Sequence, residues 1–313
     1  MLSPEQFLKD MESNRIDYGA IKWSPGYKAI IPGGGADYNL LIPVRGRQRF
    51  LKPCLAHIRE SAASANVSVR VVVIENAAEP VYPDLCREAC VAYVCVPPDD
   101  KRSEGLFEKS LCYNMGFMEA PRTEWCIFHD VDILVERGFF GKVREHLAKG
   151  AKWLQPYRER RVRMLSSYAT ALIEAGQYEN APGWMNEYST PSKPGSPGGS
   201  VVVRSDDFEA VGGYDPELFY GYSPEDSFFW TKLEILHGKG QGIIQNHFLG
   251  AAAYADDPPI DVYHLHHEPA SGQNKKYSWM LELLQSFYFY DDPVRRDIIQ
   301  RKREILAESL GLT

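Results

Sequence analysis

Trp125-Cys-Ile-Phe-His-Asp-Val-Asp-Ile-Leu134 is the stretch that says most about the fold of this chain. Its first five residues, 125–129, are mostly apolar and are typical of a buried strand in a parallel sheet. Asp130 and Asp132 follow, and residues i and i+2 point to the same side of an extended chain. Two such carboxylates repel each other unless a cation or donor lies between them, and a hard divalent ion is the usual solution. The alternative is a strand that ends in a solvated acidic turn.

The pattern around this stretch alternates between strands and helices. Apolar, β-branched runs predict further strands at 38–44, 69–75 and 92–96. Helical spacing of apolar residues predicts helices after Phe50 and over 106–120. Such alternation favours an α/β fold with a doubly wound, mostly parallel central sheet and helices on both faces. Open sheets of this class bind ligands at the carboxyl ends of their strands, which is where Asp130 and Asp132 fall.

The second half of the chain is less regular. Residues 176–199 are rich in Pro, Gly, Ser and Asn, and we expect a mobile lid that becomes ordered when a ligand binds. A short strand is expected at 201–203, and the loop 220–226 should open a helix. Two helices form a C-terminal extension. The expected divisions are an N-terminal extension (1–37), a main domain (38–270, with halves 38–150 and 200–270 around an insertion at 151–199) and C-terminal helices (271–313).

Composition limits the classes of partner. The chain has 313 residues and a formal net charge of −7, which argues against a nucleic-acid binder because such proteins present a basic face. No apolar run reaches the length of a membrane span, and no signal peptide is apparent, so peripheral association is the only membrane contact we consider. The six cysteines lack the spacing of a zinc site. These features favour a reducing, cytoplasmic setting.

Two charged pairs lie near expected strand or helix ends. Arg45 and Arg47 follow the first strand of the sheet, and the arginine fork matches phosphate oxygens. A solvated surface pair is the competing interpretation. Glu225 and Asp226 stand at a helix start, where they could simply complement the helix dipole. The tyrosines beside them would otherwise shape a pocket for a flat, hydrogen-bonding ligand.

A histidine-rich segment, His264-Leu-His-His267, ends another expected strand. On a strand His264 and His266 share one face, whereas His267 points away. Two imidazoles at this spacing suit one metal ion, although a single histidine is usually structural, and the two carboxylates elsewhere favour a metal site.

Several of these motifs together resemble the β-1,4-galactosyltransferase family, glycosyltransferase family 7. The resemblance is carried in order by Asn39-Leu-Leu-Ile-Pro-Val-Arg-Gly-Arg-Gln-Arg49, by the segment 106–120, by Phe128-His-Asp-Val-Asp-Ile133, by Gly198-Gly-Ser-Val-Val202, by Gly213-Tyr-Asp215 and by the Glu225-Asp226 loop. His264-Leu-His266 resembles the metal histidines of the family's xylose-acceptor branch. The resemblance implies a GT-A fold and a metal-dependent enzyme that inverts the anomeric carbon. In the loop 220–228, tyrosines and Ser223-Pro224 replace the family's usual tryptophans and glycines.

The resemblance also implies individual roles. Asp226 would be the catalytic base and Glu225 would bind the acceptor sugar. Mn²⁺, or another divalent cation such as Mg²⁺, would be the cofactor, held by Asp132, His264 and His266. Within the GT-A domain, 38–150 would be the nucleotide-binding half, 151–199 the acceptor or lid insertion and 200–270 the catalytic half. Nucleotide-sugar binding would involve Pro43, Arg45, Arg47, Asp130, Val131, Asp132, Gly199 and Tyr222.

The implied reaction moves a hexose or N-acetylhexosamine from a UDP-sugar to a hydroxyl of a saccharide or glycoconjugate acceptor, as a galactosyltransferase does. Eukaryotic members of the family carry a membrane anchor, so the chain resembles a cytoplasmic bacterial enzyme or a catalytic domain trimmed of its anchor. Two alternatives stay open: a nucleotidyltransferase-like enzyme that handles sugar nucleotides, and an inactive sugar-binding protein on the same fold.

Overall fold

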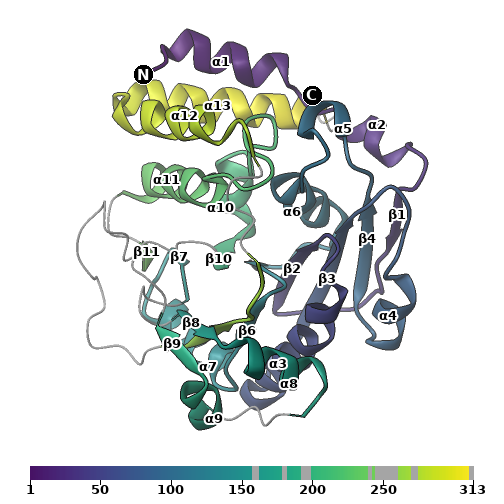
Figure 1. The fold of residues 1–313 in the computed structure, drawn as a ribbon. Coiled ribbons are helices and arrows are strands. Elements are labelled where there is room, and N and C mark those ends of the chain that lie inside the picture. The colour runs from purple at the N-terminus through teal and green to yellow at the C-terminus, as the bar shows by residue number, and fades with distance from the viewer. Residues whose placement is uncertain are drawn as a thin grey trace.

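A central sheet with helices on both faces organises the protein, and a smaller sheet lies beside it (Figure 1). The structure, a computed structural model, describes residues 1–156, 162–177, 182–191, 199–238, 242–243, 260–268 and 274–309. Among these residues, no helix is both long and apolar enough to cross a lipid bilayer.

The central sheet has eight strands in the order β1-β4-β3-β2-β5-β10-β7-β11. Their bounds are Lys28–Ile30 (β1), Tyr38–Val44 (β2), Val69–Asn76 (β3), Ala92–Val96 (β4), Trp125–His129 (β5), Trp153–Leu154 (β7), Ser200–Arg204 (β10) and Gly242–Ile243 (β11). Strands β4, β3, β2 and β5 are parallel to one another, and β11 is parallel to β7. Strand β1 is antiparallel to β4, and β10 is antiparallel to both β5 and β7. The predicted α/β class and mostly parallel sheet are therefore confirmed.

The two faces of the sheet are covered by different helices. Because side chains alternate along a strand, Leu41 and Phe128 join one apolar cluster while Leu40 and Ile127 join another. The first cluster lies under helices α6 (Lys109–Glu119) and α11 (Glu225–His237), and the second under helices α3 (Gln48–Ala65) and α7 (Phe139–Ala148). The helices are Pro4–Ser13 (α1), Tyr18–Lys22 (α2), Gln48–Ala65 (α3), Pro83–Glu88 (α4), Asp100–Ser103 (α5), Lys109–Glu119 (α6), Phe139–Ala148 (α7), Ser167–Glu174 (α8), Pro182–Glu187 (α9), Ser205–Ala210 (α10), Glu225–His237 (α11), Tyr277–Phe289 (α12) and Asp292–Ser309 (α13).

Helix α6 packs unusually close to the sheet. A Cβ on Gly116 would lie 2.6 Å from the side chain of Ile74 on β3, so only glycine fits at this position. The sequence predicted that this helix begins at Leu106, but it begins at Lys109. Just before the helix, the amide of Glu108 donates to the side chain of Asn76 at 3.2 Å. The first residue of α6, Lys109, is thereby placed at the carboxyl edge of the sheet.

A second sheet of four strands, in the order β6-β12-β8-β9, was not predicted. Its strands are Ile133–Val135 (β6), Val262–His264 (β12), Val162–Leu165 (β8) and Ser189–Pro191 (β9). Much of the region expected to be irregular, 151–197, thus forms strands and short helices. Residues 178–181 and 192–198, on which the predicted lid largely depends, lie outside the described residues, so the lid stays a prediction.

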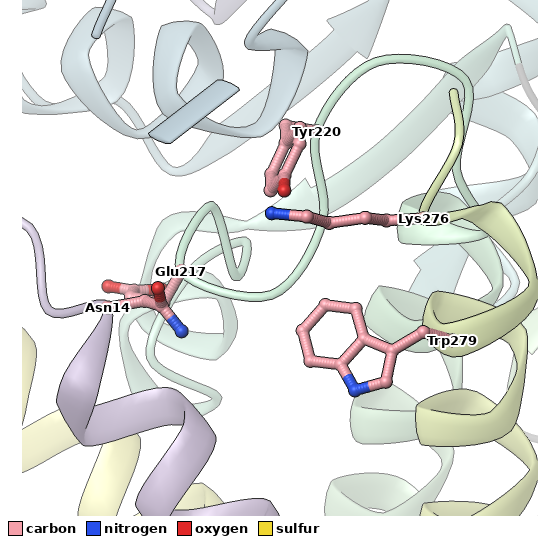
Figure 2. Close-up of a pocket in the computed structure, with 5 residues that line it drawn as sticks. All are labelled: Asn14, Glu217, Tyr220, Lys276 and Trp279. Carbon is pink, nitrogen blue, oxygen red and sulfur yellow. The ribbon is translucent and has the colours of Figure 1, made fainter. Parts of the chain in front are cut away.

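The two ends of the chain pack against each other. Figure 1 shows α1 beside α12 and α13, far from β6 and β8. Phe7 of α1 stacks on Phe228 of α11 with ring centroids 6.0 Å apart, and Arg301 of α13 pairs with Glu12 at 2.7 Å. The predicted C-terminal helical extension is confirmed. Between α1, the segment 217–220 and the start of α12 lies a pocket of about 320 Å³ (Figure 2).

Candidate functional site

The turn after β5 is held from several directions. The amide of Ile133 donates to the carbonyl of Asp130 at 3.1 Å, which closes the turn. The amide of Asp130 donates to the carbonyl of Gly199 at 2.7 Å, which ties the turn to the start of β10. Nε2 of the buried His129 lies 3.0 Å from the carbonyl of Ile133, and burial lowers the pKa of His129. A neutral histidine therefore braces the base of the turn.

Asp130 and Asp132 face different partners because the strand ends before them. Asp130 lies 3.1 Å from Nζ of Lys109 and accepts a hydrogen bond from Tyr113 at 3.1 Å. Asp132 instead forms an ion pair with Arg47. The expectation that the two carboxylates lie on one side with a cation between them is wrong, since the alternation of an extended chain does not apply within a turn.

Asp132 lies in a pocket of basic side chains. Its carboxylate is almost fully buried, and its Oδ2 lies 3.0 Å from Nε2 of His267 and 3.9 Å from Nε2 of His264. Burial alone would raise the pKa of Asp132, but His267, His264 and Arg47 outweigh it and hold the pKa well below its ordinary value. Asp132 is thus ionised at neutral pH.

One atom from each of Asp132, His264 and His267 lies within 4.8 Å of the other two. Two imidazoles and one carboxylate fit a first-row divalent ion such as Mn²⁺ better than Mg²⁺, which prefers oxygen ligands.

The structure exchanges the expected roles of His266 and His267. We expected His266 to share a face with His264 and His267 to point away. Instead His266 is exposed, and its amide donates to the hydroxyl of Thr170 at 2.9 Å. Strand β12 ends at His264, and the next amide, that of Leu265, donates to the carbonyl of Asp132 at 2.8 Å. The chain therefore leaves the strand before alternation can place His266.

Lys109 connects the turn to the acidic start of α11. Its Nζ lies 3.0 Å from Glu225, 3.0 Å from Asp226 and 3.1 Å from Asp130. Burial opposes its charge, but the three carboxylates outweigh burial and hold the pKa of Lys109 well above its ordinary value. One ammonium thus faces three carboxylates, which leaves the cluster with an excess of negative charge.

Asp226 has the properties of a base tuned toward neutral pH. Its side chain is only 16% exposed. Burial raises its pKa, Lys109 lowers it, and Glu225 and Asp130 raise it further, which brings the pKa of Asp226 to about 7. Asp226 stands in the first turn of α11, a position that also fits the alternative that its charge complements the helix dipole.

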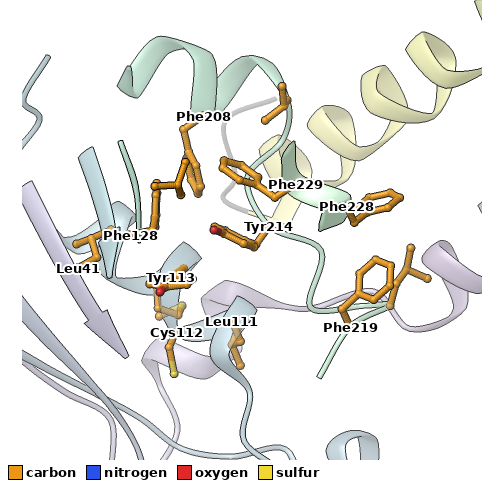
Figure 3. Packing of buried hydrophobic residues seen from close by; sticks show 14 of the residues in the cluster. Leu41, Leu111, Cys112, Tyr113, Phe128, Phe208, Tyr214, Phe219, Phe228 and Phe229 are labelled. Atoms are coloured by element: carbon orange, nitrogen blue, oxygen red, sulfur yellow. The ribbon is translucent and has the colours of Figure 1, made fainter. Parts of the chain in front are cut away.

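A cluster of stacked aromatic rings sets the position of α11 against the sheet (Figure 3). Tyr214 stacks on Phe229 of α11 with ring centroids 4.2 Å apart, and Tyr113 of α6 lies 4.9 Å from Tyr214. Phe128 of β5 meets Tyr113 edge to face at 5.0 Å. These contacts connect β5, α6 and α11, the three elements that carry Asp130, Lys109 and Asp226.

The other residues predicted to bind the donor differ in burial and in their contacts. Pro43, Val131 and Gly199 are buried, and Gly199 has φ 123, a backbone conformation that favours glycine. Arg45 is turned toward β3 and α6, where it donates to the carbonyl of Leu106 at 2.8 Å. Tyr222 is exposed and stacks on Tyr277.

Sequence reasoning missed Lys109, Tyr113 and His267. The predicted site combined four carboxylates with only two arginines. That imbalance indicated a further cation, which Lys109 supplies. No comparable local signal was available for Tyr113, whose hydroxyl reaches Asp130 only after α6 packs on the sheet.

No protein-family model and no curated protein matches the sequence. Solved structures with a similar fold include the catalytic domain of Drosophila β1,4-galactosyltransferase 7 in complex with xylobiose (17% identity, 74% of this chain and 71% of that chain, TM-score 0.42). They also include a mannosyltransferase from Pyrobaculum calidifontis in complex with GDP-Man and Mn²⁺ (14% identity, 98% and 83%, TM-score 0.49). A third is glucosyl-3-phosphoglycerate synthase from Mycobacterium tuberculosis (12% identity, 80% and 80%, TM-score 0.48). Each likeness is weak in both sequence and superposition.

Proposed function

We propose that the protein is a metal-dependent inverting glycosyltransferase of the GT-A type, which moves a hexose or N-acetylhexosamine from a UDP-sugar to a saccharide hydroxyl. One observation carries the proposal. The turn 130–132 joins a candidate metal site, formed by Asp132, His264 and His267, to a candidate base, Asp226, through Lys109. A transfer reaction needs both functions at one place.

The donor half of the site would bind a nucleoside diphosphate. Asp132, His264 and His267 would hold the divalent ion, with His267 in the role first expected for His266. When bound, such an ion supplies Lewis-acid stabilisation of the negative charge that develops on a departing diphosphate. Arg47 lies beside Asp132, and its guanidinium would contribute further positive charge to the phosphate oxygens.

The acceptor half would be formed by the start of α11. A sugar hydroxyl is a poor nucleophile until a base takes its proton, and a positioned base typically contributes about 10²–10⁴-fold in rate. Asp226, with a pKa of about 7, is matched to that task at neutral pH. Glu225, which accepts a hydrogen bond from Ser223 at 2.8 Å, would bind the acceptor sugar.

Of the alternatives, a nucleotidyltransferase would have no need for Asp226 as a base, and an inactive sugar-binding protein would have no need for a base tuned to neutral pH. The geometry therefore favours glycosyl transfer. The two enzymes release different products, since a glycosyltransferase leaves UDP, whereas a nucleotidyltransferase forms or consumes pyrophosphate.

The deciding experiment is incubation of a panel of UDP-sugars with Mn²⁺, with and without saccharide acceptors, followed by assay of UDP and pyrophosphate. We expect UDP release that requires Mn²⁺ and increases with an acceptor. His267→Ala should raise the Mn²⁺ concentration needed for UDP release about tenfold or more, while His266→Ala, a matched change at an exposed neighbour, should leave it unchanged. Release of pyrophosphate without UDP would refute the proposal.

A further inference from the structure

The pocket between α1 and α12 lies apart from the turn 130–132 but borders the loop that carries Glu225 and Asp226. Its volume of about 320 Å³ is within the range of small-molecule sites, roughly 300–1,000 Å³. Figure 2 shows its five lining side chains around a common space, with Lys276 and Trp279 coming from the start of α12. The lining residues are Asn14, Glu217, Tyr220, Lys276 and Trp279.

The chemistry of the lining is polar with aromatic surfaces. Trp279 and Tyr220 supply rings, while Asn14, Glu217 and Lys276 supply hydrogen-bonding groups. Glu217 is almost fully buried; one of its oxygens accepts from Lys302 at 2.6 Å, and the other, Oε1, has no hydrogen-bond partner among the described residues. This oxygen is covered by surrounding atoms, so hydrogen bonds to a ligand would come from Asn14 and Lys276.

The lining of the pocket also argues against two other ligand classes. Lys276 is paired with Glu104 at 3.2 Å, and Glu217 is paired with Lys302, so the charges of the described lining residues are balanced and do not favour a phosphate or carboxylate. A purely apolar ligand would cover the polar groups of Asn14 and Lys276 without replacing the hydrogen bonds that they make with water. A neutral ring that carries several hydroxyls can stack on the indole of Trp279 and bond to both side chains.

The pocket shares the loop 220–226 with the acceptor half of the proposed site. Asn274 donates to the carbonyls of Tyr220 and Tyr222 at 2.7 and 3.1 Å, which holds this loop against the start of α12. The ring of Tyr222 is 49% exposed and stacks on Tyr277 of α12, with ring centroids 5.3 Å apart. An exposed aromatic ring thus lies in the chain between Tyr220, which lines the pocket, and Glu225.

We infer that this pocket binds a neutral sugar unit of the acceptor beyond the unit that reacts, so that the preferred acceptor is an oligosaccharide rather than a monosaccharide. The inference rests on the proposed function. It assigns the specificity for acceptor length to Trp279 and Lys276, neither of which belongs to the metal site or the base.

Binding is tested first, without donor, on the full chain. Calorimetry and tryptophan fluorescence would compare xylose with xylotriose, glucose with cellotriose, and N-acetylglucosamine with chitotriose. At least one trisaccharide should bind more tightly than its monosaccharide, and Trp279→Ala should weaken that binding about tenfold. Trp23→Ala, at a tryptophan that is 91% exposed, is the matched control and should leave the binding unchanged.

Transfer is tested second. With a donor that the protein hydrolyses in the presence of Mn²⁺, Trp279→Ala and Lys276→Ala should each raise the ratio of KM for the trisaccharide to KM for the monosaccharide, by about tenfold for Trp279. Lys275→Ala, at the exposed neighbouring lysine, should leave this ratio unchanged. The same pair of lysine variants keeps the test valid if Trp279→Ala does not fold.

Three outcomes would overturn the inference. The first is that no trisaccharide binds more tightly than its monosaccharide, and the second is that the pocket variants behave like their controls while donor hydrolysis proceeds, in which case the proposed function stands. The third is binding that depends on Trp279 without any donor hydrolysis. That result would refute the proposed function, and with it the role of the pocket in acceptor selection.

Discussion

Asp226→Asn is the change that tests the proposed chemistry most directly. Asparagine has nearly the same shape as aspartate but cannot take a proton from an acceptor hydroxyl. We expect transfer to fall by about 10²-fold or more. Binding of UDP and Mn²⁺ should be retained, because Asp226 contacts Lys109 rather than the residues around Asp132. In the wild type, transfer should rise with pH as Asp226 loses its proton near pH 7.

The same variant has a predictable effect on stability. The pKa of Asp226 rises from 3.8 to about 7 on folding. A group whose pKa is raised on folding contributes stability below its unfolded pKa and loses it as the pH rises through the folded value. At 1.36 kcal/mol for each pKa unit, the ionised side chain costs about 4 kcal/mol above pH 7. Asp226→Asn avoids this cost. The difference in free energy of unfolding between the variant and the wild type should therefore shift in favour of the variant by about 3 kcal/mol as the pH rises from about 5 to about 8.

The assay is chemical denaturation of both proteins at these two pH values, together with transfer rates over the same range. Asp206→Asn is the matched control, because Asp206 is 68% exposed on α10 and lies outside the site. It should change neither the rate nor its pH dependence. A stability difference between Asp226→Asn and wild type that does not vary with pH would refute the account of the buried carboxylate. Transfer at nearly the wild-type rate would show that the base lies elsewhere, and Glu225 would be the next candidate.

Three further predictions concern the metal site and Lys109. Asp132→Ala should abolish the Mn²⁺-dependent part of UDP binding measured by calorimetry, and an unchanged dependence on Mn²⁺ would contradict the assignment. His264→Ala and His267→Ala should each weaken Mn²⁺ binding by tenfold or more in a metal titration, about 1.4 kcal/mol, whereas a loss of that size in His266→Ala would show that the strand alternation first expected is correct. Lys109→Met should move the pH midpoint of transfer upward, because its ammonium lowers the pKa of the proposed base; a midpoint that moves downward would refute this role.

Local patterns in the sequence were sufficient for the class of the fold. The strands at 38–44, 92–96 and 125–129 have the predicted bounds, because a strand buried on both faces must be apolar throughout. The position of the Asp-Val-Asp turn at a strand's carboxyl end followed from the same pattern. The strand expected at 201–203 is present as β10, but its antiparallel pairing and the small second sheet were not foreseen. Strands of two to five residues carry too little periodicity for their partners to be predicted from sequence.

The composition of the site was decided by tertiary contacts. His267 rather than His266 meets Asp132 because a hydrogen bond between Leu265 and Asp132 ends strand β12, and alternation holds only while a strand continues. Lys109 and Asp226 are 117 residues apart in the chain, and they meet because α6 and α11 pack on the same face of the sheet. Periodicity reports which side of its own element a residue occupies. Which charged groups then face one another depends on how those elements pack, and only the folded chain contains that information.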